Sequence, residues 1–306
     1  MTRIHRTAMV SVLITWAFLG MAIAQPNDSS LLDDRTLSLL QEALSGNRAK
    51  EFVNAIVNHH RVPGSRGYSD AARYVLQQFH NLGFAQNKAW IESFPSDGKI
   101  IYQTWQSPPG WSIESGELRM IHPKKEILAN FADVPMSVMS YSNPGKVQAE
   151  LVDVGKGNSD LDYEGRDVHG KLVLATGYGG DVHRLAVLKY GAAAVVCFPE
   201  DEQASGHPDT TRYTGLWPRT EELDHVTFGF NITPAQGNRL RDLLRSGTRI
   251  VLEGEVTGTG LEFGSLDVVV AEIPGNRNPE QKLIFVAHLD HPEQSANDNA
   301  SGAAAL

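Results

Sequence analysis

Apolar residues recur at helical spacing in two stretches of the first ninety residues. Residues 31–60 carry leucine, alanine, phenylalanine and isoleucine at roughly helical spacing, which predicts helix. A segment rich in glycine and proline interrupts this pattern, and residues 71–82 resume it. We expect Ser69 and Asp70 to cap the second helix and Gly83 to end it.

Strand and helix patterns alternate through the middle of the chain. An unbroken apolar run such as KLVLAT (171–176) is typical of a strand buried on both faces. A strand, a helix and a second strand in succession predict a parallel unit. The predicted elements, in chain order, are strand 87–94, small sheet and loop over 97–140, strands 147–154 and 171–176, helix 182–190, strand 192–198, helix 233–244 (capped by Thr233) and strand 249–257.

Two further apolar runs stand near the C-terminal end. Residues 266–273 and 282–287 predict strands that pair as a hairpin around the turn PGNRNPEQ. His288 would then follow the carboxyl end of the second strand, the edge at which α/β sheets bind ligands. The closing residues ASGAAAL predict the beginning of a helix.

Length and composition are those of an ordinary globular protein of α/β class. The chain has 306 residues, enough for one large domain or two medium ones. Its hydrophobic fraction is 41% and its charged fraction 21%, which excludes fibrous and wholly disordered classes. The strand and helix pattern predicts a mixed sheet flanked by helices.

The first 24 residues have the organisation of a secretory signal peptide. A basic start is followed by the uncharged run 8–24, which ends in the small-residue pattern Ala22-Ile23-Ala24. We therefore expect cleavage after Ala24 and a secreted or periplasmic protein. The alternative is an uncleaved membrane anchor, but the run is short for spanning a bilayer, so no stable anchor is expected.

Charge and cysteine content narrow the function further. The formal net charge is −9, and removal of residues 1–24, which hold two arginines and no acid, makes it −11. Nucleic-acid partners require basic surfaces, so this balance argues against them. The single cysteine, Cys197, lies in an apolar run and is interpreted as a small buried strand residue without a disulfide.

The stretch HLDHPEQSANDNASG (288–302) contains residue types suited to a metal site. His288 and Asp290 alternate on an extended segment and can face the same side. Imidazole is a common zinc ligand, and a nearby carboxylate can orient it. Asp298 offers two oxygens, which suits a carboxylate shared by two metal ions. On spacing alone the signal for a metal is weak, because a histidine at a strand end is usually structural and D-N-A-S-G also suits an ordinary helix cap.

This stretch resembles the first metal motif of secreted co-catalytic zinc exopeptidases, the family of bacterial leucyl aminopeptidases and glutamate carboxypeptidase. Its pattern is H-x-D, a short loop and G-A-x-D-N-A-S-G. The resemblance implies that His288 binds one zinc ion, that Asp298 bridges two, and that Asp290 orients the site. Ser295 replaces the usual glycine. His291 has no counterpart and is interpreted as a loop residue.

Two upstream segments also resemble this family. RVPGSRGYSDAARYVLQQFHNLGF (61–84) is similar to its N-terminal arginine, Gly-Ser and amphipathic helix, and 137–258 looks like an inserted protease-associated domain. The resemblance implies an incomplete zinc-exopeptidase fold with this α/β insert. The expected divisions are signal peptide 1–24, N-terminal peptidase part 25–136, insert 137–258 and the start of the metal-binding core 259–306.

The family pattern contains groups for which this chain offers no match. They are a Glu-Glu pair that supplies the general base and a ligand, then an Asp and a His. Glu221 and Glu222 lie in the predicted insert and are interpreted as a charged loop. We therefore expect a truncated sequence that lacks the general base. The intact protein would be an exopeptidase, an aminopeptidase first of all, acting on peptides or proteins with two zinc ions, and the fragment would be inactive.

Three alternatives remain open. The first is a non-catalytic, receptor-like member of the same fold, although such relatives tend to lose the metal residues that are present here. The second is an enzyme like glutaminyl cyclase, which resembles the family but uses one zinc ion. The third is an interaction protein built around residues 137–258. The sequence gives no indication of the oligomeric state.

Overall fold

The computed structural model describes residues 32–278 and 280–306, so the predicted signal peptide lies outside the described residues. The chain forms two compact units, up to Gly46 and from Asn47 onward. The first unit holds helix α2 (Asp34–Ala43), whose N-cap Asp33 accepts a hydrogen bond from the Thr36 amide. Within the described residues, no helix has the length and apolarity needed to cross a membrane.

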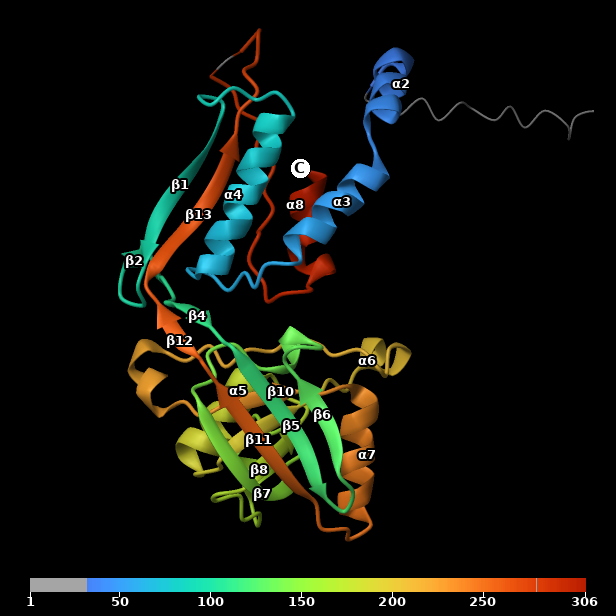
Figure 1. Cartoon of the computed structure of the whole chain (residues 1–306), viewed down its shortest axis with the longest axis vertical. Coiled ribbons are helices and arrows are strands. Elements are labelled where there is room, and N and C mark those ends of the chain that lie inside the picture. The colour runs from blue at the N-terminus through green and yellow to red at the C-terminus, as the bar shows by residue number, and fades with distance from the viewer. Residues whose placement is uncertain (1–31, 279) are drawn as a thin grey trace, which may run out of the picture. The chain divides into compact units, whose positions relative to one another are not determined.

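The second unit contains every described strand (Figure 1). Its helices are α3 (Gly46–Ile56, which begins at the unit boundary), α4 (Arg66–Asn81), α5 (Gly179–His183), α6 (Glu202–Gly206), α7 (Pro234–Arg245) and α8 (Ser301–Ala305), with shorter helical turns η1 (Pro135–Ser137), η2 (Asp160–Tyr163), η3 (Arg184–Lys189), η4 (Thr220–His225) and η5 (Ala296–Ala300). Its strands are β1 (Ala89–Ser96), β2 (Ile101–Tyr102), β3 (Trp105–Gln106), β4 (Gly110–Ser112), β5 (Ser115–His122), β6 (Glu126–Asn130), β7 (Gly145–Asp153), β8 (Leu172–Ala175), β9 (Ala194–Cys197), β10 (Gly229–Asn231), β11 (Val251–Thr257), β12 (Gly260–Glu262) and β13 (Gly264–Ala271).

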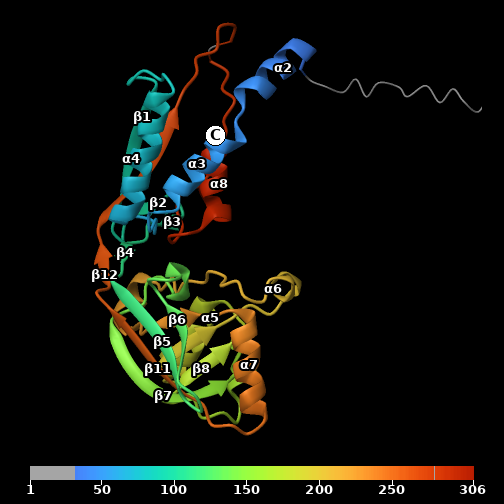
Figure 2. The same cartoon turned by 45° about the vertical axis from the view of Figure 1, so that its right-hand side comes forward.

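A seven-stranded mixed sheet organises the larger hydrophobic core. Its strand order is β10-β9-β8-β7-β11-β5-β6, parallel from β10 to β7 and antiparallel from β7 to β6. Every residue of β8 and β9 is buried, whereas β11 alternates buried and half-buried positions. Helix α7 lies beside the sheet (Figure 2) and packs against β7, while α5 packs against β9.

This sheet confirms the predicted α/β class with a mixed sheet and flanking helices. The predicted strands 147–154, 171–176, 192–198 and 249–257 correspond to β7, β8, β9 and β11. Cys197 is buried at the end of β9, and burial raises the pKa of its thiol to about 12. The sheet also includes β5 and β6, so it begins before residue 137. The domain divisions and the protease-associated character of the insert stay predictions.

The start of α7 is defined by its cap, and its packing by one glycine. The Thr233 hydroxyl accepts from the Gln236 amide while the Gln236 side chain accepts from the Thr233 amide, which is a capping box. A methyl group placed on Gly237 would overlap the ring of Phe198. The helix therefore approaches the end of β9 more closely than an alanine would allow.

We expect Gly237→Ala to lower the free energy of unfolding by about 2 kcal/mol, because the added methyl group overpacks the contact with Phe198. Urea denaturation followed by circular dichroism measures the change. Gly206→Ala is the matched control, since a methyl group added to Gly206 would meet no atom within 4 Å. Equal stability of the two variants would contradict the close approach.

Buried His183 on α5 must be neutral to keep its hydrogen bond. Its Nε2 accepts from the Thr227 amide at 3.2 Å, and the side chain is almost fully enclosed. Burial lowers the pKa of His183 to about 4; nearby Glu222 opposes this and Arg184 adds to it. The imidazole is therefore uncharged at neutral pH.

The fold should accordingly lose stability as the pH falls from 6.5 to about 4. The folded-state pKa of His183 lies below the unfolded value, so its contribution is complete above pH 6.5 and is lost below it. The expected loss from this residue is about 3 kcal/mol. The free energy of unfolding is measured at pH 7 and at pH 4 for the unmodified protein and for His183→Gln. The difference between the two pH values should be about 3 kcal/mol smaller in the variant. Exposed His207→Gln should keep the original pH slope.

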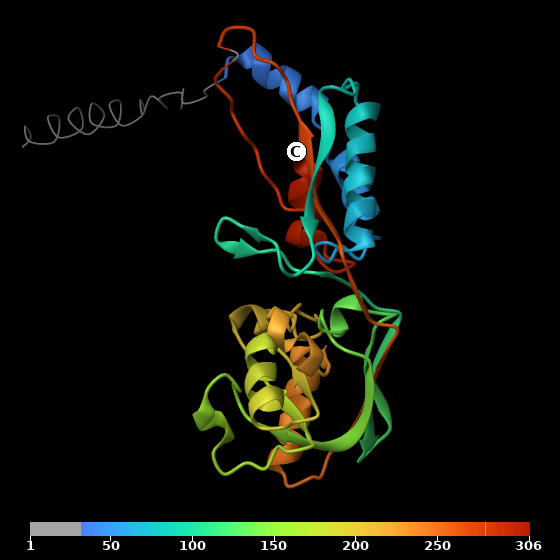
Figure 3. The ribbon, with the colours of Figure 1, turned by 90° about the vertical axis from the view of Figure 1, so that its left-hand side faces the viewer.

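Strands β1 and β13 form a separate antiparallel pair with α4 against it (Figure 3). Their register runs from Ala89 opposite Ala271 to Ser96 opposite Gly264. A second core, formed by residues of α3, α4 and this pair, encloses Leu289 and Ala300 from the C-terminal segment. The candidate metal motif is thus anchored in this core by two of its apolar residues.

Two helix predictions need correction. The expected helix over 31–60 is two helices, α2 and α3, because α2 ends at Ala43 with Leu44 in extended conformation. Helix α4 begins at Arg66 and is capped by Ser65, whose hydroxyl accepts from the Tyr68 amide. Ser69 and Asp70 are therefore inside the helix, one turn after its actual cap. Gly83, at φ +99°, follows its last turn as predicted.

The predicted hairpin of 266–273 with 282–287 is wrong. The first run is β13, which pairs with β1. The second run is not a strand, and Leu283, Ile284, Phe285 and Val286 are exposed. An ion pair between Lys282 and Glu272 (3.0 Å) keeps the two runs close beyond the turn. Residues 282–287 form no strand beside β13, and His288 therefore does not follow the carboxyl end of a strand.

Candidate metal centre

The structure brings together the three residues that the sequence singles out. Nε2 of His288 lies 2.9 Å from Oδ1 of Asp298, and Nδ1 lies 3.2 Å from Oδ1 of Asp290. Nε2 therefore faces the carboxylate of Asp298, while Nδ1 faces the carboxylate of Asp290 and also its backbone carbonyl oxygen, which lies 3.2 Å away. The side chains of all three residues are between 38% and 59% exposed, which leaves the cluster open to solvent and ions.

The local backbone places Asp298 toward the histidine. Asp298 interrupts the helical turn η5 with an extended conformation (φ −117°, ψ 96°). The Asn299 side chain then accepts from the Gly302 amide at the start of α8. The D-N-A-S-G sequence thus forms a bend into a helix, as its composition predicts.

His291 is closer to this cluster than the sequence indicates. Its Nε2 lies 3.6 Å from Oδ2 of Asp298, and its ring lies 4.6 Å from the ring of Tyr213. Burial lowers the pKa of His291, and Asp298 opposes that shift. It remains a loop residue, but one packed beside the candidate ligands. The only sequence signal for this was its place three residues after His288.

Arg61 holds the segment that carries the motif. Its guanidinium is fully buried and donates to the carbonyl groups of Ile56, His59, Leu289 and Ser295. Its backbone also exchanges two hydrogen bonds with His291, at 2.9 and 3.0 Å. Burial lowers the pKa of Arg61 to about 10, so the group stays charged at neutral pH. One side chain therefore links the end of α3, through Ile56, to the motif loop at Leu289 and at Ser295.

His60 also contacts the loop that carries the motif. Its Nδ1 accepts a hydrogen bond from the Glu293 amide at 3.2 Å, and its ring contacts Trp111 and Phe131. Burial lowers the pKa of His60 to about 4, with Arg61 adding to the shift. The neutral ring is used as a structural acceptor and is enclosed by aromatic groups.

Imidazole nitrogen and carboxylate oxygen are among the donors that bind zinc in proteins, so His288 and Asp298 fit two positions of a zinc site. In the described part of the chain, no group of three or more His, Cys, Asp or Glu side chains is placed to hold a metal ion. Glu222 accepts from the Arg219 amide and pairs with Arg184, and so serves the η4 turn. The donor set suits zinc but offers only part of a coordination sphere.

Comparison with known proteins supports the same family. Residues 268–306 match the family model described as Peptidase family M28. This match contains the whole motif and confirms the resemblance to zinc exopeptidases. No curated protein matches the chain significantly.

Solved structures share the fold. An aminopeptidase from Aneurinibacillus sp. strain AM-1 is 23% identical, with a TM-score of 0.53, 87% of this chain covered and 58% of the other. A peptidase M28 precursor from Shewanella amazonensis is 15% identical, with a TM-score of 0.61, and the coverage is 87% and 60%. A zinc aminopeptidase from Bacillus subtilis is 17% identical, with a TM-score of 0.51, and the coverage is 84% and 54%. The chain therefore spans less than two thirds of these structures.

Proposed function

We propose that this chain carries the first part of the zinc site of an exported exopeptidase, an aminopeptidase that acts on peptides or proteins. The observation that carries the proposal is the pairing of His288 with Asp298 and Asp290, inside the segment that matches Peptidase family M28. The three neighbours that share the fold include two aminopeptidases. Export rests on the signal-peptide pattern of residues 1–24.

The proposed roles follow from which atoms face one another. His288 would bind zinc through Nε2 and Asp298 would bind it through its carboxylate. Asp290 faces Nδ1 and would hold the imidazole in its orientation and tautomer. When bound, zinc supplies a Lewis acid that activates water and polarises a carbonyl group.

Release of p-nitroaniline from leucine p-nitroanilide by the full-length protein tests this function. We expect release that 1,10-phenanthroline abolishes and zinc restores. No release by the metal-loaded protein would overturn the proposal and favour a receptor-like member. Cyclisation of an N-terminal glutamine peptide with one zinc ion per chain would favour a cyclase.

The 306-residue chain itself is expected to be inactive, because only two candidate ligands lie together among its described residues. Its zinc-dependent turnover should be indistinguishable from that of a sample without protein. Robust release by the purified 306-residue chain would refute this expectation without affecting the proposed class.

A further inference from the structure

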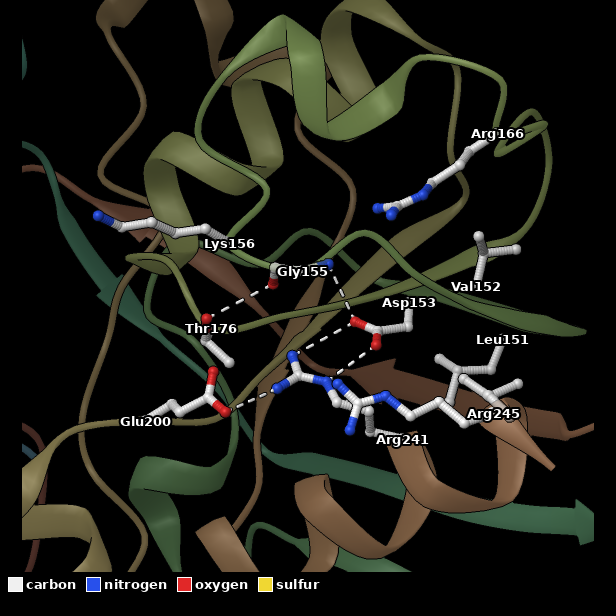
Figure 4. A pocket seen from close by; sticks show the side chains of 11 residues that line it. Leu151, Val152, Asp153, Gly155, Lys156, Arg166, Thr176, Glu200, Arg241 and Arg245 are labelled. Atoms are coloured by element: carbon white, nitrogen blue, oxygen red, sulfur yellow. Dashed lines mark hydrogen bonds and ion pairs between the residues drawn. The ribbon is translucent and has the colours of Figure 1, made fainter.

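A pocket of about 910 Å³ lies in the seven-stranded sheet region, at the carboxyl ends of its parallel strands (Figure 4). Asp153 ends β7, Thr176 follows β8, and Glu200 follows β9; helix α7 supplies the opposite wall. This is the edge at which parallel α/β sheets bind ligands. The pocket shares no residue with the metal motif, so a ligand bound there is independent of the proposed function.

The two carboxylates of the pocket are already paired. Arg241, only 6% exposed, donates to Asp153 from Nε (2.9 Å) and Nη2 (3.3 Å) and to Glu200 from Nη1 (3.0 Å). Its guanidinium also lies over the ring of Phe198. Figure 4 shows this arginine between its two partners. Because both carboxylates face Arg241, a metal cation is a poor match for the pocket.

Three further cations remain: Lys156, Arg166 and Arg245. Among the described residues, Lys156 has no ion-pair partner. Arg166 donates only to the Asp162 carbonyl, a neutral group, and Arg245 lies 3.7 Å from Asp242 at the exposed end of α7. The lining therefore carries two more positive than negative charges in a chain of net charge −9. Such a local reversal of sign favours an anionic ligand.

The position of Lys156 is defined by its loop. Gly155 and Gly157 flank it with φ of +75° and +72°, conformations that favour glycine. The Gly155 carbonyl accepts from the Thr176 amide at 2.9 Å, and the Lys156 carbonyl accepts from the Gly177 amide at 2.8 Å. The loop is thereby attached to the end of β8, and the exposed Lys156 side chain extends from it away from Arg241 in the view of Figure 4.

The remaining lining indicates which anion fits. Leu151, Val152 and Leu244 give the pocket an apolar wall beside its cations. No aromatic side chain is among the described residues that line it, so a nucleotide base would have no ring to stack on. The volume exceeds what a single inorganic anion needs and falls in the range of pockets for larger ligands. We propose that this pocket binds a peptide segment that carries both carboxylate and aliphatic side chains.

Fluorescence anisotropy of a labelled octapeptide of alternating leucine and glutamate tests this site on the purified chain. We expect saturable binding that weakens as salt is raised. The double variant Lys156→Glu and Arg166→Glu should bind at least about tenfold more weakly, because it places like charges opposite the ligand. The milder pair Lys156→Ala and Arg166→Ala should also weaken peptide binding. It replaces the glutamate pair in the test if the charge reversal perturbs folding.

The matched control is Lys124→Glu with Lys125→Glu, which changes net charge equally at exposed positions outside the pocket. It should bind the peptide within about twofold of the unmodified chain. Equal weakening by both glutamate pairs would overturn the site, as would equal binding of a leucine–glutamine peptide. Competition by inorganic phosphate at the affinity of the peptide would also overturn it, since the aliphatic contacts would then contribute nothing.

Discussion

Arg61→Ala should lower the free energy of unfolding by about 3–5 kcal/mol, the largest effect expected from any single substitution outside the sheet core. The buried guanidinium donates to four carbonyl groups on two segments more than 200 residues apart in sequence. Alanine would leave those acceptors buried without partners and open a cavity where the side chain lay. Urea denaturation measures the loss.

The effect should depend on the shape of the group as well as its charge. Arg61→Lys keeps the charge, but one ammonium cannot donate to carbonyls spread around a planar guanidinium, so most of the loss should remain. Arg73→Ala, which removes an exposed arginine paired with Asp70 on α4, should cost under about 1 kcal/mol. A loss of similar size in Arg61→Ala and Arg73→Ala would contradict the structural role.

Hydrogen exchange would locate the damage. Because Arg61 contacts the carbonyls of Leu289 and Ser295, amides of the loop around 289–295 should lose protection first in Arg61→Ala. Helix α7, in the other core, should keep its protection. Uniform loss through both cores would show that Arg61 stabilises the whole unit instead of the motif loop.

The role of Arg61 illustrates what the sequence cannot predict. Its partners are backbone carbonyls, which every residue carries, so no residue pattern identifies them. The sequence does indicate a significant arginine at position 61 through the family resemblance, but not that it attaches the motif loop to α3. In the same way, nothing in the sequence places Tyr213 against His291.

Strand pairing also has a part that the sequence predicts and a part that it does not. Strands β8 and β9 are predictable because each is an apolar run buried on both faces, and the two are linked locally through a helix. The partner of β13 is β1, whose residue 93 pairs with residue 267, and an apolar run does not say which distant edge it will join. The hairpin prediction failed because it assumed the nearest run was the partner.

The proximity of the three candidate residues is predictable, since they lie within eleven positions of one another, whereas their role in a metal site stays a prediction. Short loops leave few ways to separate His288, Asp290 and Asp298, and the structure places them in contact. What a short motif cannot supply is a complete coordination sphere, because such ligands come from separate elements brought together by the fold.

Zinc binding by the 306-residue chain should therefore respond in a graded way to substitutions in the cluster. His288→Ala and Asp298→Ala should each weaken zinc about 100-fold or more, because each removes one of the two facing donors, and a 100-fold change corresponds to about 2.7 kcal/mol. Asp290→Asn should weaken it about tenfold, since Asp290 faces Nδ1 and acts through the orientation of the ring. Competition with a chromophoric chelator measures all three affinities.

Exposed His207→Ala is the control for loss of a histidine and should leave zinc affinity unchanged. The ranking is the informative result. If Asp290→Asn weakened zinc as much as His288→Ala, Asp290 would be a ligand itself and the assignment of Nδ1 would be wrong. If none of the three variants differed from His207→Ala, the contact between His288 and Asp298 would be an ordinary hydrogen-bonded pair. An intermediate loss of zinc affinity in Asp290→Asn therefore indicates a metal centre with an orienting carboxylate. It distinguishes that centre from one in which Asp290 is a ligand and from a hydrogen-bonded pair without metal.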